Sequence, residues 1–185
     1  MVDKIEKDAH DRMHKTIETL KREFGTVRTG KASPHLLDTV TVEAYGTQMP
    51  LNQVATVTAP EPRLLVVTPF DKSTVGNVVK GIQAADLGFN PMVDGQIIRV
   101  PIPALNEERR RTLVKQCKHL AEEARVAVRN IRRDANEYLK QAEKDSKISE
   151  DEMRKSLDKV QKLTDEHIKE IDSLLTVKEK EVMEV

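Results

Sequence analysis

The chain has 185 residues, and its 31 basic and 31 acidic side chains give a formal net charge of zero. Aromatic residues make up only 3% of it and tryptophan is absent, which excludes an aromatic platform for stacking single-stranded nucleic acid. A single cysteine excludes an intrachain disulfide and suits a reducing compartment. No signal-peptide core and no run of about 18 apolar residues is found, so we expect a cytoplasmic protein without a membrane partner.

The first predicted element is a helix from about Asp3 to Arg28. Asp3 and Glu6 could cap its start, and Gly30 followed by Pro34 favours its end. Apolar residues recur every three or four positions, as on one face of a helix: Ile5, Ala9, Met13, Ile17, Leu20, Phe24 and Val27.

The middle segment, residues 31–104, has a different composition, because it contains all eight prolines and five of the seven glycines. Ser73 is the expected cap of a short helix that ends near Leu87-Gly88, and Asp94-Gly95 predicts a turn. Alternating or β-branched runs predict strands at residues 38–44, 54–58, 64–68 and 96–100. We therefore expect a small α/β domain inserted into a helical protein.

A second helix is predicted to begin after Asn106, which is a good cap and is followed by two glutamates. Neither glycine nor proline interrupts it up to about Lys144, so it should be about 55–60 Å long. Its expected core positions are Leu113, Cys117, Leu120, Ala124, Val128, Ile131, Ala135, Tyr138 and Ala142.

A third helix is predicted to begin at Ser149, which forms a capping box with Glu152, and Ile148 and Met153 occupy the positions of a hydrophobic staple. Its expected apolar stripe is Met153, Leu157, Val160, Thr164, Ile168, Ile171 and Leu175. The link of about four residues makes helices two and three antiparallel neighbours.

Helix one can bury its stripe against this hairpin. The predicted fold class is α+β: a long antiparallel three-helix bundle from residues 1–30 and 105–185. A small α/β domain with a β/α/β sandwich-like arrangement is inserted at residues 31–104.

The second helix has an uneven charge distribution. Between Arg109 and Arg133 there are nine basic residues and two acidic ones, Glu122 and Glu123. At about 100° per residue, one side of the helix, away from the apolar stripe, carries Arg111, Lys115, Lys118, Arg125, Arg129, Arg132 and Arg133. Such a side can bind phosphates and release their counterions. It fits equally well a solvated face paired with acidic residues of helix three, and less well a surface for an acidic protein.

Other chemistry is weakly indicated. His10 and His14 have the spacing of two metal ligands on a helix, but a third ligand is not evident, and we expect no metal site. Cys117 lies on the apolar stripe and is expected to be a buried, inert thiol. The glycines of the middle segment form no phosphate-binding loop. We therefore expect no catalytic residue, no cofactor and no enzymatic activity.

Four segments resemble those of ribosome recycling factors: Val27–Pro34, Ile98–Pro103, Glu107–Arg110 and Arg125–Asn136. The resemblance covers essentially the whole chain, with departures at Lys31, where the family more often has arginine, and at Asn106, where threonine would serve equally as a cap. It implies an L-shaped protein whose bundle contacts large-subunit ribosomal RNA. With elongation factor G and GTP, such a protein separates the ribosomal subunits after termination and frees messenger RNA.

Matched position by position, the resemblance implies RNA contacts for six arginines, in this order: Arg132, Arg129, Arg133, Arg110, Arg28 and Arg125. Antiparallel packing is expected to bring Arg28 near residues 125–133. The resemblance also implies that the α/β domain meets elongation factor G and that the protein acts as a monomer. A hinge is expected at Gly30, Lys31, Ala104 and Leu105.

Two other functions remain open at this point. The first is a general RNA-binding or chaperone-like module without specificity for the ribosome. The second is a helical protein–protein adaptor that uses the apolar and acidic faces of helix three.

Overall fold

The computed structural model describes residues 1–29 and 31–184. The chain divides into two compact units. Unit 1 contains Met1–Phe24 and Lys115–Glu179, and unit 2 contains Gly25–Val114 and Lys180–Val185.

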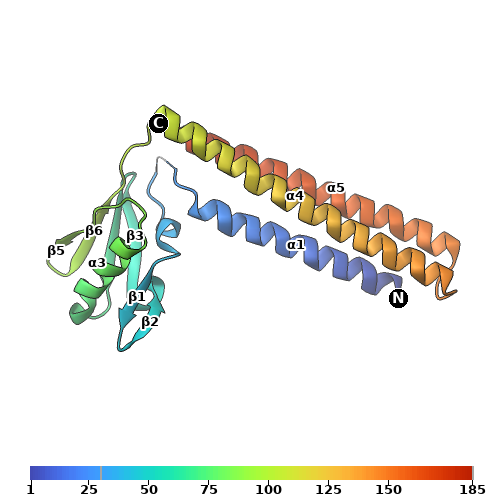
Figure 1. Ribbon diagram of the computed structural model, residues 1–185, viewed down its shortest axis with the longest axis horizontal. Coiled ribbons are helices and arrows are strands. Elements are labelled where there is room, and N and C mark those ends of the chain that lie inside the picture. Colours follow the sequence, from blue (N-terminus) through green and yellow to red (C-terminus); the bar gives the residue numbers. More distant parts are fainter. Residues whose placement is uncertain (30, 185) are drawn as a thin grey trace. The chain divides into compact units, whose positions relative to one another are not determined.

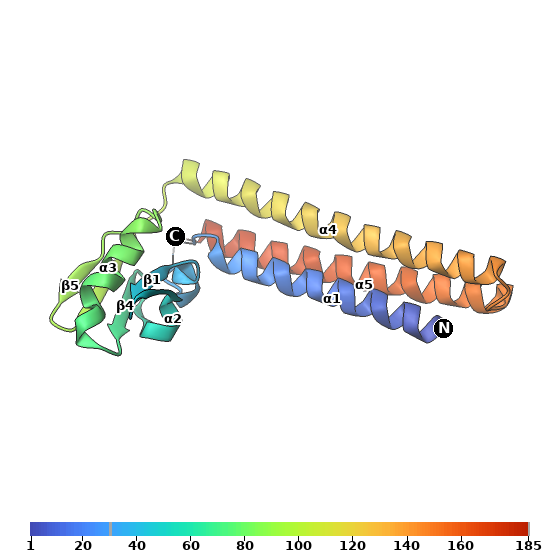
Figure 2. The same cartoon turned by 60° about the horizontal axis from the view of Figure 1, so that its bottom comes forward.

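Unit 1 is a bundle of three long helices (Figures 1 and 2). They are α1 (Val2–Thr26), α4 (Glu107–Lys144) and α5 (Glu150–Met183), whose ends reach into unit 2. α1 and α5 run in the same direction and α4 runs opposite to both, which confirms the predicted antiparallel bundle. The predicted stripe of α1 forms part of the core, with these side chains buried: Ala9, Met13, Ile17, Leu20 and Phe24.

The starts of α4 and α5 are set by the capping residues that the sequence predicted. Asn106 Oδ1 accepts a hydrogen bond from the backbone N–H of Arg109 at 2.7 Å, as an N-cap does. The capping box of α5 is also confirmed, since Ser149 N–H donates to Glu152 Oε2 at 3.0 Å and Glu152 N–H donates to Ser149 Oγ at 3.1 Å. The predicted cap of α1 is wrong: α1 begins at Val2, so Asp3 lies within its first turn.

The core stripe of α4 differs from the prediction at two positions. Tyr138 is 58% exposed and Leu120 is only half-buried, whereas the neighbouring Leu139 and Ala121 are fully buried. In both places two successive apolar residues lie three and four positions after the previous core residue. Either could continue the core stripe, and the prediction chose the wrong one. The other predicted core positions of α4 are buried: Leu113, Cys117, Ala124, Val128, Ile131, Ala135 and Ala142.

The core side of α5 is more polar than predicted. Leu157, Ile168 and Leu175 are half-buried, while Ser156 and His167 are buried together with the predicted Val160, Thr164 and Ile171. Buried polar groups are tolerated when they are hydrogen-bonded. Ser156 Oγ donates to Glu6 Oε1 of α1 at 2.8 Å, and His167 Nδ1 lies 2.6 Å from the carbonyl oxygen of Leu163.

Unit 2 contains two antiparallel sheets. β1 (Thr41–Ala44) pairs with β2 (Thr47–Pro50). The larger sheet has the order β3-β4-β6-β5, formed by β3 (Ala55–Glu61), β4 (Leu64–Pro69), β5 (Met92–Asp94) and β6 (Ile97–Pro101). The helices are α2 (Leu51–Val54) and α3 (Val75–Ala84), with 3-10 turns at Pro34–Leu37 and Lys72–Thr74. Val42, Leu65, Val67, Val78, Ile82 and Ile98 are among its core residues.

Several predicted details of unit 2 are wrong. The strand predicted at residues 38–44 begins only at Thr41, because a 3-10 turn precedes it. Ser73 does not cap α3, because it lies in the 3-10 turn Lys72–Thr74. The cap of that turn is Asp71, whose side chain accepts a hydrogen bond from Ser73 N–H at 2.9 Å. The N-cap of α3 itself is Thr74. α3 ends at Ala84, before the predicted Leu87-Gly88. β2 and β5 were not predicted, because they are short and mostly exposed and lack a clear alternation.

The two ends of the inserted segment are fixed to one turn of the sheet. Ala32 N–H donates to Pro62 O at 2.6 Å, and Ile102 N–H donates to Arg63 O at 2.8 Å. Pro62 and Arg63 follow each other between β3 and β4. The chain therefore enters and leaves this part of unit 2 at neighbouring carbonyl groups.

Candidate nucleic-acid interface

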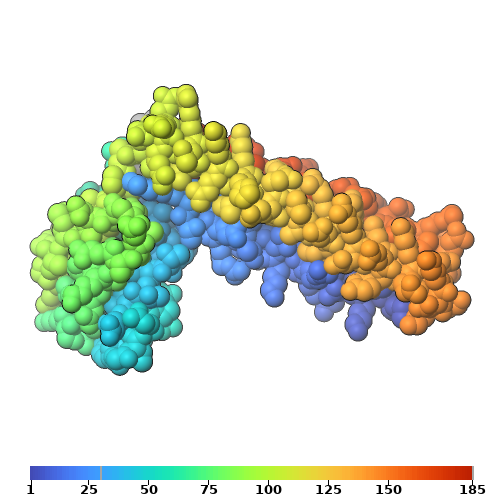
Figure 3. Space-filling model, viewed as in Figure 1, coloured from blue at the N-terminus to red at the C-terminus, as the bar shows by residue number. Residues whose placement is uncertain are grey.

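α4 provides a rigid support for the basic side chains. It has 38 residues, and an uninterrupted helix holds successive side chains at fixed angles about its axis. In the space-filling view its side chains form a continuous band along one face of the bundle (Figure 3). What each basic side chain can do depends on its partners.

Arg125 is held by two carboxylates. Its Nε and Nη2 lie 2.9 and 2.7 Å from Asp172 Oδ1 of α5, and its Nη1 lies 2.9 Å from Glu122 Oε2. Burial acts to lower the pKa of Arg125, but the hydrogen bonds to Asp172 and Glu122 outweigh it and the pKa is raised. This is the pairing with helix three that the solvated-face interpretation predicted, and it makes Arg125 a link between two helices.

Arg129 shares Glu122 with Arg125. Its Nη1 lies 3.4 Å from Glu122 Oε1, and its side chain is 41% exposed. The hydrogen bond from Arg125, followed by the charges of both arginines, lowers the pKa of Glu122. Glu122 therefore stays ionised near neutral pH and offsets part of the positive charge here.

Arg132 and Arg133 have no carboxylate partner among the residues that the structure describes. Arg132 Nη1 donates to the neutral Gln161 Oε1 of α5 at 3.3 Å. Arg133 is exposed and makes no hydrogen bond or ion pair with any residue that the structure describes. Lys115 and Lys118, further along α4, are likewise exposed and unpaired within residues 1–29 and 31–184. These four side chains therefore present positive charge without a carboxylate partner among the described residues.

Arg28 and Arg110 lie in unit 2. Arg28 Nη2 donates to Pro103 O at 2.9 Å, and its guanidinium lies 5.6 Å from the centre of the Phe89 ring. Burial, and then the nearby charge of Arg109, lowers the pKa of Arg28. Arg110 Nη2 donates to Leu105 O at 3.3 Å. The expected position of Arg28 near residues 125–133 is wrong, because antiparallel packing brings the end of α1 to the start of α4.

The predicted hinge residues have different environments. Lys31 Nζ lies 3.2 Å from Glu184 Oε2 near the end of α5. Leu105 is buried and Ala104 is exposed. Gly30 lies outside the described residues.

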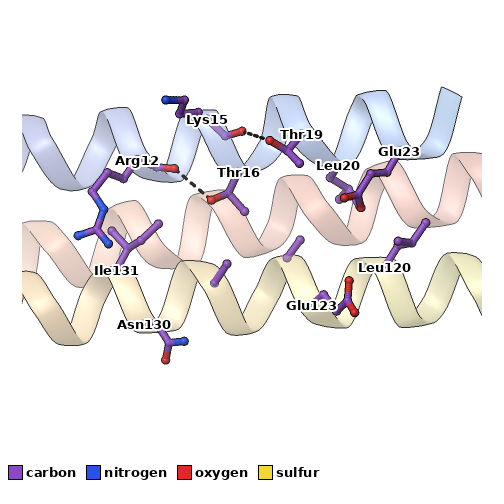
Figure 4. Close-up of a pocket in the computed structure, with 12 residues that line it drawn as sticks. Arg12, Lys15, Thr16, Thr19, Leu20, Glu23, Leu120, Glu123, Asn130 and Ile131 are labelled. Atoms are coloured by element: carbon purple, nitrogen blue, oxygen red, sulfur yellow. Dashed lines mark hydrogen bonds between the residues drawn. The ribbon is translucent and has the colours of Figure 1, made fainter. Parts of the chain in front are cut away.

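A groove of about 690 Å³ runs between α1 and α4 (Figure 4). Arg12 and Lys15 line it together with Glu23 and Glu123, so its charges are mixed. The α4 residues that line it lie on a different side of the helix from the arginines discussed above: Leu120, Glu123, Ala124, Ala127, Asn130 and Ile131. The groove therefore does not extend the basic surface.

The structure brings His167 beside the predicted pair of histidines. The His10 ring lies 6.3 Å from that of His14 and 5.7 Å from that of His167. Even so, no three His, Cys, Asp or Glu side chains in the described part of the chain could together hold a metal ion. Cys117 is fully buried as predicted, and burial raises the pKa of its thiol. Among the described helices none is long and apolar enough to span a membrane.

A bundle of three long helices with an inserted sheet segment and a basic side on α4 has the features of a helical nucleic-acid-binding protein. The family model for ribosome recycling factor matches residues 20–183. The chain belongs to the ribosome recycling factor family.

The relatives and solved structures match nearly all or all of the chain. The chain is 56% identical over 185 residues to the ribosome-recycling factor of Carboxydothermus hydrogenoformans, covering 100% of both chains. It is 57% identical over 175 residues to that of Bacillus subtilis, covering 95% of each. A solution structure of a ribosome recycling factor matches with a TM-score of 0.80 and 42% identity, over 100% of this chain and 98% of the other.

A second solved structure matches with a TM-score of 0.70 and 42% identity, over 100% of both chains. It is the T. thermophilus ribosome recycling factor, described with E. coli elongation factor G bound to the E. coli post-termination complex.

Proposed function

We propose that this chain binds the ribosome after termination and, with elongation factor G and GTP, separates the subunits and releases messenger RNA. It acts as a monomer in the cytoplasm, where ribosomes work. It is not an enzyme and has no catalytic residue or cofactor of its own. The energy comes from GTP hydrolysis on the partner.

The observation that carries this proposal is the positive charge of Arg132 and Arg133, which have no carboxylate partner among the described residues. Each cation that neutralises an RNA phosphate releases counterions, and this release contributes a large share of the binding free energy. An arginine can also hold one phosphate through two parallel hydrogen bonds. Large-subunit ribosomal RNA is the partner that fits a rigid, positively charged helix in a member of this family.

We assign the arginines graded roles within this interface. Arg132 and Arg133 make the main phosphate contacts, because no carboxylate of the described residues pairs with them. Arg129 contributes less, since Glu122 offsets its charge. Arg110 and Arg28 contact RNA near the start of α4, and Arg125 adds charge mainly by holding α5 in place.

The mechanical part of the proposal is a lever. Residues 1–30 and 105–185 form the arm that binds RNA, residues 31–104 form the domain that meets elongation factor G, and Gly30, Lys31, Ala104 and Leu105 flank the hinge. Two features support it. Both ends of the inserted segment are fixed to one turn of the sheet, and the related T. thermophilus factor is described together with elongation factor G on a post-termination complex.

The test is a subunit-splitting assay with purified ribosomes, elongation factor G and GTP. We expect Arg132→Glu to abolish splitting while helicity and melting temperature stay almost unchanged, because the substitution reverses a charge and removes only one contact to Gln161. The matched control is Arg154→Glu, an exposed arginine of α5 paired only within its own helix turn with Glu150. Full activity of Arg132→Glu would remove the RNA anchor from the proposal.

A second measurement separates this function from general RNA binding. Affinity for intact large subunits and for an unrelated RNA duplex is titrated against salt concentration. A ribosome-specific factor prefers the subunit at every salt concentration, whereas equal affinities would contradict the proposal.

A further inference from the structure

Two buried polar atoms on α4 have no hydrogen-bond partner among the residues that the structure describes. They are Nε of Arg132 and Oδ1 of Asn136. The two residues are four positions apart in one helix, so their side chains are neighbours on its surface. One atom is a donor and the other an acceptor. Polar side chains at this spacing on a helix can form a hydrogen bond with each other.

The surroundings of Arg132 differ from those of Arg125 in one respect. Arg125 is held by the carboxylates of Asp172 and Glu122, which offset its charge. Arg132 is held by the amide of Gln161, and the atom that could complete its support is the amide oxygen of Asn136. Amide oxygens orient a guanidinium without neutralising it. The contrast is the one expected between an arginine that joins helices and an arginine whose charge is left without a carboxylate partner for a ligand.

The amide of Gln161 is itself oriented. Its Nε2 donates to Asp165 Oδ1 at 2.9 Å, one turn further along α5. This bond turns Oε1 of Gln161 toward Arg132, where it accepts from Nη1 at 3.3 Å. One side of the guanidinium is therefore fixed from α5, and its Nε side lacks the corresponding support.

We propose that Asn136 is a positioning residue for Arg132, accepting a hydrogen bond from its Nε so that Nη2 is directed to an RNA phosphate. The inference rests on the proposed RNA-binding function of α4 and adds a residue to it. Asn136 does not contact RNA in this arrangement. It acts only through Arg132, by reducing the number of orientations that the guanidinium samples before it binds.

The experiment is a double-mutant cycle read out as affinity for purified large ribosomal subunits. The variants are Asn136→Ala, Arg132→Ala and the double substitution, with Asn130→Ala as the control. Asn130 is an exposed asparagine of α4 that lines the groove beside α1, away from the arginines. Asn136→Ala should weaken binding about threefold to tenfold, as the net loss of one ordinary hydrogen bond does, and should leave the melting temperature unchanged.

The double-mutant cycle separates the positioning role of Asn136 from the RNA contact of Arg132. If Asn136 acts through Arg132, Asn136→Ala has no further effect in the Arg132→Ala background, because coupled residues are not additive. Additive effects, or an unchanged affinity of Asn136→Ala when Arg132→Ala binds weakly, would overturn the positioning role alone. An unchanged affinity of Arg132→Ala would overturn the proposed RNA contact, and the positioning role with it.

Discussion

Glu122 and Arg129 face each other across two turns of α4, with Glu122 Oε1 3.4 Å from Arg129 Nη1. The other carboxylate oxygen of Glu122 lies 2.9 Å from Arg125 Nη1. Glu122 is thus an acid placed within the basic side of the helix. It holds two arginines in position and reduces the net positive charge on this side of α4.

Replacing Glu122 with glutamine should therefore strengthen RNA binding. The Glu122→Gln variant frees the charge of Arg129, so its affinity for large subunits should rise and the slope of log affinity against log salt should steepen by up to about one. The matched control is Glu123→Gln, the adjacent acid, which pairs with His119 and lines the groove beside α1. Equal gains in both variants would indicate a general effect of net charge.

The same carboxylate predicts a pH dependence of stability. Arg125 and Arg129 lower the pKa of Glu122 in the folded protein. A lowered folded-state pKa contributes stability above the unfolded pKa, and this contribution is lost as the pH falls through the folded value. The melting temperature of the natural chain should therefore exceed that of Glu122→Gln at neutral pH. The difference should disappear in acid, and a constant difference across the pH range would contradict this assignment.

Gly81 should be intolerant of a side chain. A Cβ built on it would lie 2.6 Å from Thr41 O of β1, closer than atoms normally approach. Gly81→Ala should lower the free energy of unfolding by about 1–3 kcal/mol, the usual cost of overpacking. Gly76 in the same helix has nothing within 4 Å of a Cβ, and Gly76→Ala should raise stability by up to about 1 kcal/mol. Urea denaturation of both variants measures the two changes in the free energy of unfolding. An unchanged free energy for Gly81→Ala would contradict the prediction.

Cys117 should be unreactive in the folded protein. Its side chain is fully buried, and burial raises the pKa of the thiol, so little thiolate forms near neutral pH. A colourimetric thiol reagent should react many times faster in denaturing urea than in buffer. The control is an exposed thiol, Ser173→Cys in a Cys117→Ser background, which should react at similar rates in both. Fast labelling of native Cys117 would show that the bundle opens there.

The long helices could be predicted because their signals are local. The capping box at Ser149 and the cap at Asn106 specify starts that the structure reproduces. The core was predicted less well where two neighbours could both continue the stripe, as with Tyr138 and Leu139. Which one is buried depends on how α4 is rotated against its partners, and hydrophobic spacing does not define that rotation.

Polar core residues and exposed strands could not be predicted from local hydrophobic spacing. Ser156 is buried because Glu6 of a distant helix accepts its hydrogen bond, and a hydrophobic pattern contains no trace of that pairing. β5 is a strand because β6 pairs with it across the turn at residues 95–96. The charged side of α4 was visible in the sequence. Which of its arginines pair with carboxylates and which with an amide could not be predicted, because that depends on the side chains that α5 places beside them.

The hydrogen bonds from Ala32 to Pro62 and from Ile102 to Arg63 bring the two ends of the inserted segment to adjacent peptide groups. A segment whose two ends lie close together is a structural unit that can be exchanged. It could be excised and its ends joined by a short glycine linker, or exchanged for that of a relative, while the flanking helices keep their register. Evolution could thus vary the segment that we propose meets elongation factor G and leave the helical part of the molecule unchanged.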